Sequence, residues 1–223
     1  MRKLGLEIFQ ELKTVLSGKI LDAVLPALLF VILNGQFGLS VAVIGAGIAA
    51  FSFGVMRILR KQSFAYAFGG LVSVILAGSM ALIADNATNY FLPGIISNAF
   101  ILVLAIGSLL IDKPMAAYAS HISRGWKIDW FWLKSIKPAY REVTWIWTAF
   151  FLMRTLIQLT LYSRNDVSQL GWANTLMGLP ITIIVLVLSY IYGIWRLKTL
   201  QGPGIDEYMA KKEAPYRGQN RGF

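Results

Sequence analysis

The sequence predicts an all-α, polytopic membrane protein with six transmembrane helices and with its N and C termini in the cytoplasm. The chain of 223 residues is 57% hydrophobic and has a mean hydropathy of +0.61, well above the value of a soluble domain with one core. Several runs reach the roughly 20 apolar residues that a helix needs to cross about 30 Å of hydrocarbon. The basic residues collect on one side of these runs.

The first segment, residues 1–17, places Leu4, Ile8 and Leu12 at helical spacing with charges between them. It lacks the apolar core and cleavage site of a signal peptide, so we expect an amphipathic segment that is retained on the cytoplasmic membrane surface.

Six apolar runs then form one membrane domain over residues 18–197. The first run is the weakest, because it is short and carries Asp22 and Pro26. It is either a spanning helix extended towards residue 15 or a broken one. In chain order, the expected spans are residues 20–34, 38–58, 64–84, 91–111, 143–162 and 172–195.

The dipeptide Leu-Pro recurs near the start of three of these spans, at residues 25–26, 92–93 and 179–180. The first two occurrences would suit a three-plus-three inverted repeat. Proline near the start of a helix is also common for its own reasons, so the repeat is only a hypothesis.

The topology follows from charge. All but two of the 21 Lys and Arg residues flank the spans on one side, and the exceptions are Arg154 inside the fifth span and Arg164 in the loop after it. By the positive-inside rule both termini are cytoplasmic and the number of spans is even, which fits six spans. Because the basic residues are spread over separate loops, they predict contact with anionic lipids and no binding of nucleic acid.

Two cytoplasmic segments have a distinctive composition. The loop before the fifth span interleaves Trp126, Trp130, Phe131 and Trp132 with lysines, which predicts anchoring at the level of the lipid headgroups. The polar cytoplasmic tail, residues 198–223, is rich in Gly and Pro, a composition typical of a disordered end.

The fifth span carries a polar stripe. Its members recur at steps of three and four residues and therefore share one helix face: Thr144, Thr148, Phe151, Thr155, Gln158 and Tyr162. Arg154 lies beside the stripe. A charged Arg near the centre of a span costs about 2.5–3.5 kcal/mol on insertion scales, so it should face the bundle and have partners.

Depth in the membrane suggests those partners. At about 1.5 Å per residue, Asn98 on the fourth span lies near the level of Arg154, and Asn174 on the sixth lies about a turn higher. Asp22 lies too near the inner side to be the counter-ion of Arg154. The candidate residues for binding a ligand or lipid are Arg154, Gln158, Asn98, Thr155, Asn174 and Asp22.

Two interpretations of this face remain open. It is either a polar clasp that fixes how helices pack, or a small outward-opening cavity whose fixed positive charge suits an anion, a lipid phosphate or a carboxylate. The absence of a visible counter-ion favours a ligand.

The composition gives little support for a covalent catalytic site or a metal site. The chain has no cysteine and one histidine, which excludes disulfides, thiol nucleophiles and a multi-His metal site. The plentiful Ser and Thr residues lack a neighbouring base. We therefore expect no catalytic residues, no metal and no cofactor.

Several segments resemble a known family. NYFLPGIISNAFILVLAIGSLLIDKP, RTLIQLTLY and MGLPI are similar to segments of the six-helix bacterial membrane family catalogued as domain of unknown function 3159, which is itself similar in outline to intracellular septation protein A. The likeness covers about residues 18–197, with an FLPG-x3-NA element that includes Asn98 and an R-x3-Q element formed by Arg154 and Gln158. It implies the six-helix fold and an envelope-related role.

We therefore expect a non-enzymatic inner-membrane protein, an accessory or envelope-assembly subunit that binds membrane lipids or the helices of other membrane protein subunits. The alternative is a small-solute or ion transporter that uses the same cavity, and an intramembrane enzyme is third. A polar path to the cytoplasm beside Asp22 would favour transport, whereas a dry inner half would favour the subunit.

Overall fold

The computed structural model describes residues 19–219, 222 and 223, and leaves aside the side chains of residues 19–24 and Tyr66. The predicted amphipathic segment 1–17 lies outside the described residues. Within them the chain forms helices and turns and no β-strand, in agreement with the predicted fold class. The elements are α2 (Lys19–Phe37), α3 (Leu39–Leu59), α4 (Phe64–Ile83), the 3-10 helix η1 (Ala87–Phe91), α5 (Leu92–Leu110), α6 (Met115–Arg124), α7 (Ile128–Phe131), α8 (Lys137–Ser163), α9 (Val167–Met177), α10 (Leu179–Leu200) and α11 (Ile205–Met209).

Three stretches of the described chain are long and apolar enough to cross a membrane: Leu39–Leu59, Ala87–Leu110 and Val167–Leu200. They contain the second, fourth and sixth predicted spans and indicate a membrane protein. Two shorter apolar stretches, Leu25–Phe37 and Ala67–Ile83, lie in α2 and α4, at the first and third predicted spans. The fifth predicted span lies in α8, which also carries charged residues.

Proline has different consequences in the first and sixth predicted spans. Pro26 lies inside α2, which is one helix. The sixth span is two helices, because α9 ends at Met177 and α10 begins at Leu179. Pro180 lacks the N–H that would bond the Leu176 carbonyl and continue α9. The sixth predicted span, residues 172–195, is therefore interrupted at Gly178.

The chain folds into two compact units. One comprises the described residues up to Ser97 together with Leu156–Ile181, and the other comprises Asn98–Thr155 and Thr182–Phe223. The boundaries fall within α5, α8 and α10, so these three helices contribute to both units.

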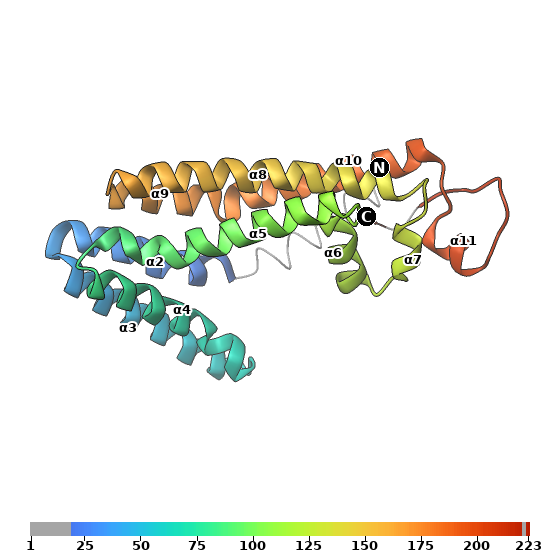
Figure 1. Ribbon diagram of the computed structural model, residues 1–223. Coiled ribbons are helices and arrows are strands. Elements are labelled where there is room, and N and C mark those ends of the chain that lie inside the picture. The colour runs from blue at the N-terminus through green and yellow to red at the C-terminus, as the bar shows by residue number, and fades with distance from the viewer. Residues whose placement is uncertain (1–18, 220–221) are drawn as a thin grey trace. The chain divides into compact units, whose positions relative to one another are not determined.

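In the first unit, α2 packs on α3 and α3 packs on α4 (Figure 1). The buried residues of α3 are small and recur every four positions: Ala42, Ala46, Ala50 and Gly54. Small residues at this spacing let helix backbones approach closely. A Cβ on Gly54 would lie 3.0 Å from the ring of Phe68 on α4, so α3 and α4 are in close contact there.

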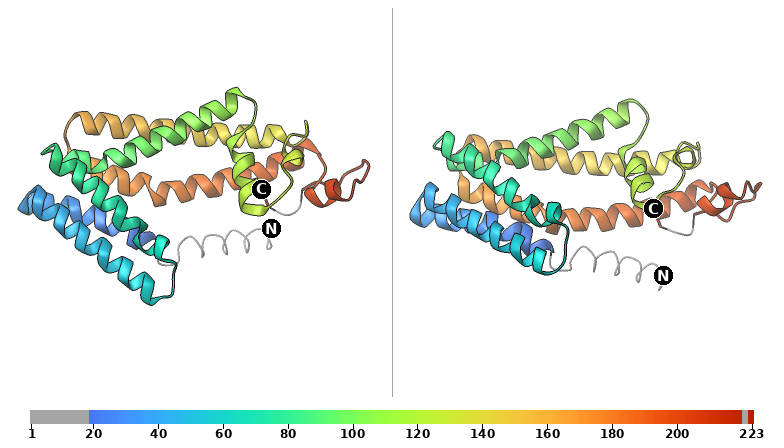
Figure 2. Two further views of the ribbon diagram at one scale, coloured as in Figure 1. Left: turned by 60° about the horizontal axis from the view of Figure 1, so that its bottom comes forward. Right: turned by 90° about the horizontal axis from the view of Figure 1, so that it is seen from below.

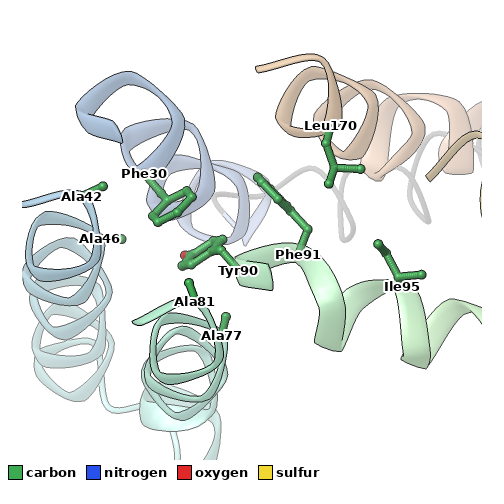
Figure 3. Packing of buried hydrophobic residues seen from close by; sticks show 9 residues of the cluster. All are labelled: Phe30, Ala42, Ala46, Ala77, Ala81, Tyr90, Phe91, Ile95 and Leu170. Atoms are coloured by element: carbon green, nitrogen blue, oxygen red, sulfur yellow. The ribbon is translucent and has the colours of Figure 1, made fainter. Parts of the chain in front are cut away.

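Aromatic rings form the core of the first unit (Figure 3). Phe30 on α2 stacks on Tyr90 with 3.8 Å between the ring centroids, and it meets Phe91 edge-on. Alanines of α3 and α4 and Leu170 of α9 complete the cluster. At the neighbouring Gly171, a Cβ would lie 2.3 Å from Val31 on α2, so α9 and α2 are in close contact.

In the second unit, α6, α7 and the tail lie near the first residues of α8 and the last residues of α10 (Figure 2). Trp130 and Phe131 are fully buried and pack edge-on against each other and against Tyr140. The expectation that these rings anchor at lipid headgroups is wrong for Trp130 and Phe131, because both belong to a protein core. Trp126 and Trp132 are half-buried.

The described part of the tail makes specific contacts. Trp130 Nε1 donates a hydrogen bond of 2.9 Å to the Pro203 carbonyl. The Glu207 carboxylate accepts hydrogen bonds from the backbone N–H groups of Gly204, Arg217 and Gly218. These bonds join the two ends of an exposed loop to the start of α11, although the composition of the tail is typical of a disordered end.

Candidate functional site

One face of α8 is buried, as the sequence predicts. The buried side chains are Thr144, Thr148, Thr155 and Gln158. Leu152, Leu156 and Leu159, on the other side of the helix, are exposed. The prediction of a polar stripe that faces the protein interior is therefore confirmed for the threonines and for Gln158.

Asn98 and Thr155 form the first polar pair of this face, within the second unit. Asn98 Nδ2 donates a hydrogen bond of 2.7 Å to Thr155 Oγ1 and a longer one of 3.4 Å to the Phe151 carbonyl. The Thr155 hydroxyl donates to the same carbonyl at 2.8 Å, one turn earlier on α8. The pair therefore joins α5 to α8 and places Asn98 at the level of Thr155, the residue after Arg154.

Gln158 and Asn174 form a second pair, within the first unit. Gln158 Nε2 donates to Asn174 Oδ1 at 2.5 Å, and Asn174 Nδ2 donates to the Leu170 carbonyl at 3.0 Å. Because a carbonyl only accepts, Leu170 sets the orientation of both amides. Gln158 Oε1 is then left buried without a hydrogen-bond partner, as an acceptor beside the end of α9.

The helix break lies one turn beyond Asn174. Gly178 has φ −68° and ψ −120°, and a Cβ there would lie 2.6 Å from the Asn174 carbonyl oxygen. A side chain here would therefore collide with that carbonyl, which favours glycine. The break thus positions the amide of Asn174 at the last turn of α9, within reach of Gln158.

Arg154 differs from its neighbours. It is half-buried, and its buried Nε has no hydrogen-bond partner. Among the side chains that the structure describes, no carboxylate forms an ion pair with it and no group accepts a hydrogen bond from it. The expected hydrogen bonds from Arg154 to amide side chains are absent among the described residues, although Gln158 Oε1 is a buried acceptor without a partner.

The remaining candidate is Asp22, whose backbone belongs to α2. Its side chain lies outside the described residues. The structure therefore brings together Asn98 with Thr155 and Gln158 with Asn174, and leaves Arg154 without a partner among the described side chains.

Sequence reasoning missed two polar clusters near the ends of the helices. In the first unit, Asn86 Nδ2 donates to Asn165 Oδ1 at 2.9 Å, and Thr88 Oγ1 donates to Asn86 Oδ1 at 2.6 Å. The Tyr162 hydroxyl donates a hydrogen bond to Asn89 Oδ1 nearby. The only sequence signal for this cluster is the number of Asn and Thr residues in the segments that contain Asn86 and Asn165.

The second missed cluster ties α8 to α10 within the second unit. Arg196 donates two hydrogen bonds to the Glu142 carboxylate, from Nε to Oε2 at 2.7 Å and from Nη2 to Oε1 at 2.9 Å. Tyr192, one turn before Arg196, donates to Glu142 Oε2 at 2.7 Å. The four-residue spacing of Tyr192 and Arg196 was a usable signal, because it places both on one face of α10.

Metal chemistry finds no site in the described residues, since no group of three or more His, Asp or Glu side chains there could hold an ion. The arrangement can instead fix helices through amides and hydroxyls and offer one guanidinium to an anion. These are the properties of a binding or assembly site.

Comparisons with known proteins add one finding. The model of a family described as protein of unknown function (DUF3159) matches residues 17–198. No curated protein and no solved structure matches the chain significantly. The match covers the helices α2 to α10 with the FLPG-x3-NA and R-x3-Q elements, and the chain is therefore a member of the DUF3159 family.

Proposed function

We propose that this protein is a non-enzymatic, multi-pass protein of the bacterial inner membrane that binds an anionic group at Arg154, as an accessory or envelope-assembly subunit. The anionic group is the phosphate of a membrane lipid or a carboxylate on the helix of a partner subunit. The distant likeness to intracellular septation protein A, which is still an expectation, agrees with a role in the envelope.

The observation that carries this proposal is the state of Arg154. Its buried Nε has no hydrogen-bond partner, whereas Asn98 Nδ2 bonds Thr155 and Gln158 Nε2 bonds Asn174. Because a charged group inside a membrane protein is costly unless it is paired, and no described side chain pairs with Arg154, we propose a bound anion as its partner. Asn98 and Thr155 then act as the clasp that holds the helices α5 and α8 beside it.

The guanidinium suits an anion with two oxygens. Its planar fork of N–H donors matches phosphate and carboxylate, and the charge is kept at any physiological pH. A lysine in its place would keep the charge and lose the fork. Comparing Arg154→Lys with wild type therefore separates hydrogen bonding by the guanidinium fork from the effect of the positive charge alone.

The proposal includes six spans with both termini in the cytoplasm. Asn86 and Asn165, from two loops expected outside, bond to each other in one unit. Trp130 and Pro203, from a loop and a tail expected inside, bond in the other. Such contacts support the topology, because segments on opposite sides of about 30 Å of hydrocarbon cannot meet.

The test compares the lipid and partner content of purified variants. Full-length wild type, Arg154→Leu and Arg154→Lys would be extracted in mild detergent and examined by native mass spectrometry. Charge-assisted hydrogen bonds contribute about 1.5–3 kcal/mol, so we expect Arg154→Leu to lower the bound anionic lipid or partner roughly tenfold or more, and Arg154→Lys to lower it less.

Arg164→Leu is the matched control, since it removes the same charge just beyond the end of the same helix. It should leave the bound species unchanged. Equal binding in wild type and Arg154→Leu would reduce Arg154 to a structural residue and overturn the proposal.

A transporter is the second candidate, and the break between α9 and α10 favours it. Interrupted helices near buried polar groups line the binding sites of many secondary transporters, and here the break follows the Gln158–Asn174 pair. Passage of ions or solutes into proteoliposomes that contain the wild-type protein, reduced by Gln158→Leu, would support transport over the subunit role.

A further inference from the structure

The last described residues of the tail occupy a defined pocket. Phe223 is 8% exposed, and its ring stacks on Tyr140 of α8 with 4.2 Å between the centroids and an angle of 13° between the planes. The contact involves a residue far from Phe223 in the sequence, so the tail returns to the membrane domain.

Glycine forms the floor of this pocket. A Cβ on Gly193 of α10 would lie 2.4 Å from Phe223 Cδ2, and two further ring atoms would lie within 2.6 Å. Any larger side chain at this position would fill the space of the ring. The lack of a side chain at Gly193 therefore creates room for an aromatic residue.

Arg124 supplies the polar side of the pocket. Its Nε donates a hydrogen bond of 2.9 Å to the Phe223 carbonyl oxygen. The guanidinium lies 5.2 Å from the ring centroid of Trp126 and 5.9 Å from that of Tyr190, which holds it in place by cation–π contact.

The residue before the aromatic is also specified. Gly222 has a φ of +65°, and a Cβ there would lie 2.6 Å from Arg124 Nη1. Both the backbone conformation and the close guanidinium demand glycine. The pocket, defined as Arg124, Tyr140 and Gly193, therefore fits a glycine followed by an aromatic residue.

The connection to the rest of the chain permits exchange. The segment from Met209 to Arg217 is exposed, and it is held at its base by the Glu207 carboxylate. Gln219 is buried, and its Oε1 accepts a hydrogen bond of 2.9 Å from the Ile205 N–H. The tail can therefore stay anchored at Gln219 and Glu207 while Gly222 and Phe223 leave the pocket and open the faces of Tyr140 and Gly193.

From these contacts we infer that the pocket of Arg124, Tyr140 and Gly193 is a peptide-binding site for a Gly–aromatic segment, which the chain fills with its own Gly222 and Phe223. The tail acts as an intramolecular ligand that competes with the same segment of a second copy of this chain. The site lies apart from Arg154 and does not depend on its role.

The experiment uses a fluorescein-labelled synthetic copy of residues 213–223 and the full-length protein in mild detergent, with binding followed by fluorescence anisotropy. Wild type should bind this probe weakly, because its own tail competes at an effective concentration in the millimolar range. Phe223→Ala should bind the probe roughly tenfold tighter or more. Phe223→Tyr keeps the ring and should behave as wild type.

Two controls locate the binding. A probe with Ala in place of its last Phe should not bind the Phe223→Ala protein. This control changes only the peptide, so a loss of binding cannot come from a folding defect of the protein. Adding Gly193→Ala to Phe223→Ala should abolish binding of the intact probe, with thermal unfolding as a check on the fold. Equal binding of both probes, or equal binding by wild type and Phe223→Ala, would overturn the inference.

Discussion

Asn98 on α5 and Thr155 on α8 share a hydrogen bond of 2.7 Å, and both side chains are buried. Asn98 belongs to the FLPG-x3-NA element of the sequence, and the R-x3-Q element contributes Gln158, which bonds Asn174. Two polar residues of these elements thus act between helices. Arg154 is the member whose partner the chain does not supply among its described side chains.

The first prediction concerns the strength of the Asn98–Thr155 bond. Asn98→Leu and Thr155→Val should each destabilise the protein by about 1 kcal/mol, with a coupling of about 0.6 kcal/mol between them, the average for bonds between membrane helices. Unfolding in detergent of both single variants and the double variant gives this coupling. Thr148→Val is the control partner, because Thr148 donates to the Thr144 carbonyl on its own helix, and its effect should add to that of Asn98→Leu. If the effects of Asn98→Leu and Thr155→Val are also strictly additive, the hydrogen bond between the two side chains contributes nothing to stability.

The second prediction concerns the helix break. Gly178→Ala should lower the stability by about 1–3 kcal/mol, because the new Cβ would collide with the Asn174 carbonyl oxygen. Gly107→Ala on α5 is the control, since a Cβ there meets nothing within 4 Å and alanine favours a helix by about 1 kcal/mol. Thermal unfolding in the same detergent compares the two. If Gly178→Ala is as stable as Gly107→Ala, the break does not require glycine.

The third prediction is a pH dependence of the tail. Hydrogen bonds from the backbone N–H groups of Arg217, Gly204 and Gly218 hold the pKa of Glu207 below its usual value of 4.5. Because the pKa is lowered in the folded state, the stabilisation is complete above about pH 4.5 and is lost as the pH falls through the lower folded value. Hydrogen exchange of this segment, corrected for intrinsic rates, should therefore accelerate at acid pH.

Glu207→Gln should weaken the protection of the tail against hydrogen exchange near neutral pH. It should also remove the acceleration of this exchange at acid pH. Glu213→Gln, in the exposed loop, should leave both unchanged. An identical exchange profile for wild type and Glu207→Gln would mean that the carboxylate does not hold the loop.

The fourth prediction tests the proposed topology. The chain has no cysteine, so single cysteines report without background. Cysteines at Gly35 and Arg164, both exposed in the structure, should react with an impermeant thiol reagent in intact cells from which the outer membrane barrier has been removed. A cysteine at Lys134, also exposed, should react only after the inner membrane is opened. Labelling of Lys134 in sealed cells would refute the assignment.

The sequence by itself determined the helical class, the boundaries of most apolar helices and the buried face of α8. These properties depend on local composition and on the periodicity of 3.6 residues per turn, which can be read without knowing any neighbour. Pro114 before α6 and Gly125 after it, in a left-handed conformation, were further local signals of a helix start and end.

Only the tertiary structure decided which polar groups meet and which do not. Depth along the helices predicted that Asn98 and Arg154 lie at one level, but the rotation of each helix about its axis sends the Asn98 amide to Thr155. The break at Gly178 and the seat of Phe223 over Gly193 likewise depend on close approach between distant segments. Composition alone favoured disorder for the tail and lipid contact for Trp130, because the physical reason for their burial is a neighbour that no local pattern in the sequence specifies.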